Sequence, residues 1–170
     1  MLDTTAISNL SQRIPSDFIV GAATASWQIE GDSAGRGRSI WDDFADGPGN
    51  IKDGSKADPA CDHVNRYQED LNLLANLGVD AYRFSFSWPR VKPGNKNVSE
   101  TGMDFYERLI DGLLDRGIKP VATLYHWDLP SELEQTGGWL NKDIYRHFAD
   151  YAELMSAKFA DRVEMWATFN

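Results

Sequence analysis

Four segments of the 170-residue sequence share one pattern, in which an apolar run ends abruptly in polar and aromatic residues. These segments are residues 18–26, 81–86, 120–124 and 163–169. Strands of a parallel sheet that are buried on both faces read as apolar runs, and in a barrel their carboxyl ends open onto the functional site. The pattern therefore predicts parallel strands with functional side chains at their carboxyl ends.

Between these runs lie three stretches with the periodicity of amphipathic helices. The first is expected to be capped by Asp58 and to end at Gly78, and the others are expected at 100–116 and at 142–159 with Asn141 as cap. Alternating strands and helices indicate an α/β fold, and eight such units in about 250 residues close a (β/α)8 TIM barrel. We expect the first four βα units of such a barrel, a half-barrel segment.

Composition and charge indicate a globular protein that does not bind polyanions. The hydrophobic and charged fractions of 42% and 25% are those of a globular protein, and the net charge of −9 argues against nucleic acid and membrane surfaces as partners. No segment approaches the roughly 20 apolar residues of a membrane span, and residues 1–13 lack the features of a signal peptide. We expect a cytoplasmic location, although a mature secreted chain would read the same.

Two strand ends carry side chains suited to a polyhydroxylated ligand. Gln28, next to Trp27, can donate a hydrogen bond to one hydroxyl and accept one from its neighbour. His126 is a directional donor or acceptor, and Trp127 offers an aromatic face to the apolar side of a pyranose. Taken alone, these segments also fit a glutamine at the sheet edge beside a core tryptophan, and a structural histidine.

Arg83 lies inside an apolar strand, where a guanidinium needs a partner. The sequence is compatible with two kinds of partner for Arg83. One is a site carboxylate from elsewhere in a barrel, and the other is an acid of a helix or loop. His63 and His147 fall on expected helices, and the single cysteine, Cys61, is expected to be a small buried helix residue. The sequence has no cluster with metal-ligand spacing and no phosphate-binding glycine motif, so neither a metal nor a nucleotide cofactor is expected.

Five stretches of the sequence, in order along nearly the whole chain, resemble the signatures of family 1 glycoside hydrolases, the β-glucosidase family. They are residues 17–31 (DFIVGAATASWQIEG), 39–42 (SIWD), 82–90 (YRFSFSWPR), 124–130 (LYHWDLP) and 166–170 (WATFN).

The resemblance implies a retaining β-glucosidase that hydrolyses terminal β-D-glucosyl residues of β-glucosides without a cofactor. It implies that Gln28, His126, Trp127 and Asn170 bind the hydroxyls of the glycone, with Asn170 at the 2-hydroxyl. It also implies that Arg83 supports the nucleophilic carboxylate.

Members of the family carry the acid/base Glu directly after the position of Asn170 and the nucleophilic Glu near the seventh strand, so both positions lie beyond residue 170. Retaining hydrolysis requires two carboxyl groups about 5–5.5 Å apart, and neither Glu30, expected at the rim, nor Glu164, at a strand start, offers a substitute. Residues 1–170 are thus expected to be the N-terminal half of a single catalytic domain, truncated after its fourth strand and inactive alone. The alternative is a non-catalytic half-barrel, natural or engineered, that pairs with a complementary half or forms a homodimer through its exposed edges.

Overall fold

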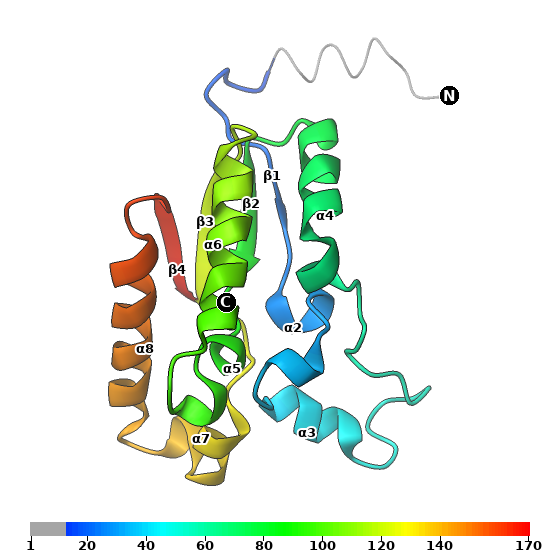
Figure 1. The fold of residues 1–170 in the computed structure, drawn as a ribbon, viewed down its shortest axis with the longest axis vertical. Coiled ribbons are helices and arrows are strands. Elements are labelled where there is room, and N and C mark those ends of the chain that lie inside the picture. The colour runs from blue at the N-terminus through cyan, green and yellow to red at the C-terminus, as the bar shows by residue number, and fades with distance from the viewer. Residues whose placement is uncertain (1–12) are drawn as a thin grey trace.

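The computed structural model describes residues 13–170, and its centre is a sheet of four parallel strands in the order β1-β2-β3-β4 (Figure 1). The strands are β1 Gly21–Ala23, β2 Ala81–Ser85, β3 Lys119–Tyr125 and β4 Met165–Phe169. Each strand pairs in parallel with its neighbour, β1 with β2, β2 with β3 and β3 with β4. The predicted parallel strands and their order are confirmed.

Three long helices cover one side of this sheet (Figure 1). They are α4 His63–Leu77, α6 Glu100–Leu114 and α8 Ile144–Phe159, and each connects two successive strands. The loops hold shorter helices, which are α2 Ser26–Ile29, α3 Ile40–Asp46, α5 Trp88–Val91 and α7 Ser131–Gln135, and the 3-10 turns Ser33–Gly35, Pro93–Asn95 and Gly138–Leu140.

The hydrophobic core lies between the sheet and these helices. The ring of Trp88 stacks on that of Tyr151 with centroids 4.6 Å apart, and Phe86 stacks on Phe159 at 5.4 Å. The Tyr151 hydroxyl is buried as well, and it donates a hydrogen bond of 2.9 Å to the carbonyl oxygen of Leu124. The apolar helix faces predicted from the sequence therefore pack on the sheet, and α8 is tied to the end of β3.

The opposite face of the sheet is open. A shallow hollow of about 320 Å³ lies on it, lined by Ile19, Gly21, Ala22, Ala23, Ala81, Arg83, Val121 and Met165. The edge strand β4 also leaves Phe169 48% exposed. In a closed barrel this face would form the interior and both edge strands would be paired.

The first strand is shorter than the predicted 18–26. Only Gly21–Ala23 pairs with β2, Phe18 is 60% exposed, and the chain turns into α2 at Ser26. Ser26 N–H donates to the Ser85 hydroxyl at 2.8 Å instead of to a neighbouring backbone carbonyl, which ends the ladder.

Two details of the first predicted helix were wrong. Asp58 does not cap it, because the Asp58 carboxylate accepts hydrogen bonds from the backbone N–H and hydroxyl of Ser33, and α4 starts only at His63. Cys61 consequently lies in the preceding loop and is exposed. The third long helix likewise starts two residues late, and Asn141 accepts from the N–H of Asp143 just before it.

None of the helices within residues 13–170 has the length and apolar composition that crossing a membrane requires. Of the stretch 1–13, in which the sequence shows no signal peptide, all but Arg13 lies outside the described residues.

Candidate functional site

The residues singled out in the sequence lie at or near the carboxyl ends of the four strands. Gln28 lies in α2, directly after β1, and Arg83 lies within β2. His126 and Trp127 follow β3, and Asn170 follows β4. Because the strands are parallel, their carboxyl ends share one edge of the sheet, where barrel enzymes hold their active sites.

A pocket of about 210 Å³ lies where α2 faces the turn after β3. It is lined by Ala25, Trp27, Gln28, Trp41, His126 and Trp127. Gln28 is exposed, Trp127 is 48% exposed and His126 is half-buried, so all three side chains can reach a ligand. The pocket is smaller than the roughly 300–1,000 Å³ of pockets for drug-sized ligands, and its lining combines an amide and an imidazole with tryptophan rings.

A second group of predicted residues is linked by hydrogen bonds across three strands. The Arg83 guanidinium donates through Nη2 to Asn170 Oδ1 and through Nε to Thr123 Oγ1, each at 2.8 Å. The Trp127 indole Nε1 donates to the carbonyl oxygen of Asn170 at 3.0 Å. The structure thus brings Arg83, Trp127 and Asn170 together, and it brings Gln28, His126 and Trp127 together in the pocket.

Arg83 has no carboxylate partner in the part of the chain that the structure describes. Thr123 and Asn170 accept its hydrogen bonds, and an acid from a described helix or loop is excluded as its partner. The prediction that a site carboxylate from elsewhere in a barrel pairs with Arg83 stays a prediction.

The surroundings of the His126 imidazole favour its neutral form. Burial lowers its pKa, and the positive charge of Arg83 lowers it further. Its Nδ1 is buried without a hydrogen-bond partner among residues 13–170. A neutral ring can donate from one nitrogen and accept at the other, which suits a hydroxyl ligand.

A buried ion pair that the sequence did not single out supports α2 from behind. The Arg90 guanidinium donates to Glu30 Oε2 at 2.8 Å and to Asp32 Oδ2 at 2.9 Å, and the Tyr106 hydroxyl donates to Glu30 Oε1 at 2.6 Å. The side chains of Glu30 and Arg90 are 4% and 3% exposed, so the prediction that Glu30 lies at the rim was wrong. The sequence did hold a signal for this pair, because Glu30 and Arg90 lie in two of the stretches, 17–31 and 82–90, that resemble the family signatures.

A second buried carboxyl group belongs to Asp128, directly after Trp127. Its Oδ2 accepts a hydrogen bond of 3.0 Å from the hydroxyl of Ser26, the first residue of α2. Burial, followed by the nearby negative charge of Glu30, raises the pKa of Asp128 to about 8. The group is therefore largely protonated at neutral pH.

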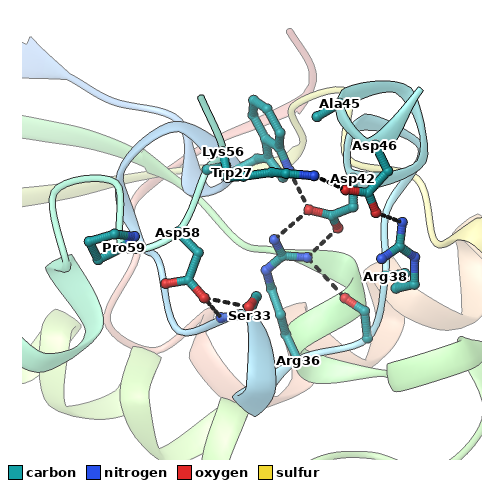
Figure 2. A pocket seen from close by; sticks show the side chains of 12 residues that line it. Trp27, Ser33, Arg36, Arg38, Asp42, Ala45, Asp46, Lys56, Asp58 and Pro59 are labelled. Atoms are coloured by element: carbon teal, nitrogen blue, oxygen red, sulfur yellow. Dashed lines mark hydrogen bonds and ion pairs between the residues drawn. The ribbon is translucent and has the colours of Figure 1, made fainter. Parts of the chain in front are cut away.

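A larger and more polar pocket of about 470 Å³ lies beside the first, and Trp27 lines both (Figure 2). Figure 2 shows Trp27 and Arg36 meeting at Asp42, whose carboxylate accepts from the indole Nε1 at 3.0 Å and from the guanidinium at 2.6 and 2.8 Å. Although burial opposes it, the Arg36 guanidinium holds the pKa of Asp42 well below its usual range. These bonds fix Trp27, which is a wall of the smaller pocket.

The other two histidines lie away from the pocket. His63 is buried with its Nδ1 2.6 Å from Asp70 Oδ2, and the His147 Nδ1 lies 3.0 Å from Asn95 Nδ2. In residues 13–170 no group of three or more His, Cys, Asp or Glu side chains is arranged to hold a metal ion.

Solved structures of β-glucosidases have this fold. A family 1 β-glucosidase from Thermotoga maritima superposes with a TM-score of 0.89 and 50% sequence identity, over 92% of this chain and 36% of that one. A psychrophilic β-glucosidase from Micrococcus antarcticus gives a TM-score of 0.91 at 50% identity, over 95% of this chain and 35% of that one. The four βα units are a half-barrel segment, as predicted.

Curated relatives agree in sequence. Beta-glucosidase A of Thermotoga maritima is 50% identical over 162 residues, and a 1,4-beta-D-glucan glucohydrolase of Thermotoga neapolitana is 49% identical over the same length. Both matches span 94% of this chain, but this chain spans only 36% and 38% of the relatives. The profile of glycosyl hydrolase family 1 matches residues 10–170, and the chain belongs to this family.

Proposed function

We propose that this chain is the N-terminal half of the single (β/α)8 catalytic domain of a retaining β-glucosidase, and that it supplies much of the pocket for the terminal β-D-glucosyl residue. The observation that carries the proposal is the pocket of about 210 Å³, in which an amide, a neutral imidazole and tryptophan faces converge. Amide and imidazole hydrogen-bond to hydroxyls, and an indole face packs against the apolar side of a sugar ring.

In this proposal Gln28, His126 and Trp127 hold the glycone, and Asn170 binds its 2-hydroxyl. Arg83 already occupies Asn170 Oδ1, so the side-chain NH₂ group of Asn170 is left to donate to the sugar. Hydrogen bonds to the 2-hydroxyl that strengthen in the transition state contribute to glycoside cleavage. Arg83, next to Asn170, would then face the nucleophilic carboxylate supplied by the rest of the barrel.

The test uses the full-length protein and an aryl β-glucoside. We expect hydrolysis with retention of configuration, and a loss of kcat/KM of about 100-fold or more in Gln28→Ala and in His126→Ala, since each loses hydrogen bonds that strengthen in the transition state. Gln135→Ala and His147→Ala are matched controls, because both residues lie outside the pocket lining. Near-parental kcat/KM in both pocket variants would remove these residues from the proposed site.

A second candidate is a non-catalytic half-barrel that self-associates. The open edges of β1 and β4 and the hollow on the uncovered face favour it, because unpaired strand edges invite pairing. Its partner would be a second copy, as a homodimer that closes the barrel. The intact mass of the protein from its native source decides between the candidates, since a mass near the 19.1 kDa of this chain would favour the half-barrel.

The proposed location is the cytoplasm, and the proposed ligand is a neutral β-glucoside and neither nucleic acid nor a membrane surface. The net charge of −9 supports the exclusion of polyanions. Cell fractionation with an antibody to the chain tests the location, and recovery in the culture medium would contradict it.

A further inference from the structure

The turn after β3 carries backbone strain. Trp127 has a φ of 72°, in the left-handed region, which a bulky non-glycine residue occupies only when its surroundings hold it there. Its indole Nε1 is held by the carbonyl oxygen of Asn170. On its C-terminal side the backbone continues into Asp128, whose side chain is 1% exposed. The backbone conformation of Trp127 is therefore held by the contact of its indole with Asn170 and by the burial of Asp128, the next residue.

A chain of hydrogen bonds connects this turn to the carboxyl ends of β1 and β2. The Ser85 hydroxyl at the end of β2 donates to Ser26 Oγ at 3.0 Å, and the Ser26 hydroxyl donates to Asp128 Oδ2 at 3.0 Å. Ser26 is buried and stands two residues before Gln28. The bond between Asp128 and Ser26 is therefore a direct side-chain link between the two turns that line the pocket.

We propose that Asp128 is a positioning residue, which holds the His126–Trp127 turn in register with the Gln28-bearing helix α2, so that both face one sugar ring. The inference rests on the proposed function, since a sugar in this pocket is the ligand that both turns would contact. Asp128 itself is buried and acts on the ligand only through its neighbours.

Stability alone is a poor reason for a carboxyl group at this position. Burial raises the pKa of Asp128 to about 8, and its Oδ1 has no hydrogen-bond partner among residues 13–170. A buried polar atom without a partner costs folding free energy, and an apolar side chain would avoid that cost. An apolar side chain could not accept the hydrogen bond of Ser26, however, and the link between the two turns would be lost.

The test compares variants of the full-length protein on an aryl β-glucoside. We expect Asp128→Ala to lower kcat/KM about 100-fold, mainly through kcat, the loss that a displacement of about 1 Å produces in a catalytic geometry. Asp128→Asn keeps the shape and an acceptor for Ser26, and we expect it to remain within about fivefold of the parent. Leu71→Ala, a fully buried residue of α4, is the control, and it should lower the melting temperature without changing either kinetic constant.

Ser26→Ala keeps the test decisive if Asp128→Ala does not fold, because it removes the same hydrogen bond by deleting one hydroxyl. We expect about a tenfold lower kcat/KM, and an unchanged value would overturn the proposal. Parental kinetics in Asp128→Ala, equal losses in Asp128→Asn and Asp128→Ala, or an equal loss in Leu71→Ala would overturn it as well. A parent that hydrolyses no β-glucoside would refute the proposed function and this inference with it. An active parent with unaffected variants would refute this inference alone, so the two failures are distinguishable.

Discussion

Replacing Arg90 by methionine should be among the most destabilising single substitutions in this chain. Methionine fills a similar volume and carries neither charge nor donor, so the substitution removes the guanidinium and little packing. Arg90 donates to Glu30 Oε2, to Asp32 Oδ2 and to the carbonyl oxygen of Gly31, and its side chain is 3% exposed. All of these acceptors lie in residues 30–32, directly after α2, the helix that carries Gln28.

The magnitude follows from what the substitution leaves behind. Glu30 is 4% exposed, and without Arg90 the Tyr106 hydroxyl would be the one donor left to its carboxylate among residues 13–170. Breaking a buried ion pair on one side costs about 3–5 kcal/mol, because the remaining charge stays buried without compensation. Replacing both partners removes that charge, so Glu30→Leu combined with Arg90→Met should be clearly less destabilised than Arg90→Met alone.

Urea unfolding of the full-length protein, followed by circular dichroism, measures these differences. Arg66→Met is the matched control, because Arg66 pairs with Glu69 on the exposed face of α4, and its midpoint should stay at the parental value. A loss below about 1 kcal/mol in Arg90→Met would refute the reasoning. So would a double variant less stable than Arg90→Met, since the carboxylate left behind would then not be the cause.

Three further results are expected. Folded Asp128 keeps its proton up to about pH 8, whereas an unfolded aspartate loses it near 3.8, so the free energy of unfolding of the parent should fall relative to that of Asp128→Asn as pH rises between these values, by roughly 1 kcal/mol per pH unit. A difference between parent and variant that is the same at pH 5 and at pH 8 would contradict this. Gly21→Ala would place its Cβ 2.8 Å from the carbonyl oxygen of Ala81, so β1 must move from β2 and the melting temperature should fall; a parental value would contradict the close approach. Residues 1–170 alone, free of full-length protein, should not hydrolyse an aryl β-glucoside, and turnover would disprove the need for carboxylates beyond residue 170.

The sequence predicted the fold well because one signal dominated it. Apolar runs and helical periodicity predicted four strands and three long helices, and the bounds of β2 and β3 lie within one residue of the predicted runs. The errors lie at element starts, where a single side chain decides. Asp58 reads as a helix cap, but its carboxylate is taken by Ser33, a contact between loop residues 25 positions apart that no periodicity reveals.

For the site, the sequence identified the residues that face the pocket and missed those that hold them. The strand ends point to Gln28, His126 and Trp127, and the family resemblance implies their binding role, whereas Asp128 and Glu30 contact partners 102 and 60 positions away. Burial reverses the prediction that Glu30 lies at the rim, and it sets the protonation of Asp128, for which the sequence made no prediction. A carboxyl group beside a pocket reads as a rim residue or catalyst, yet one of these is ion-paired and the other is largely protonated at neutral pH.

The carboxyl groups near the pocket are engaged by other side chains within residues 13–170. Glu30 is held by Arg90 and Tyr106, Asp42 by Arg36 and Trp27, and Asp128 by Ser26. A nucleophile or proton shuttle must reach the ligand, whereas each of these carboxyl groups is hydrogen-bonded to other side chains of the protein. Arg83 and Asn170, by contrast, lack a carboxylate in the described part of the chain. On the proposed function, the acid/base carboxyl group is expected directly after Asn170 and the nucleophilic one from a later strand, both close to this pair.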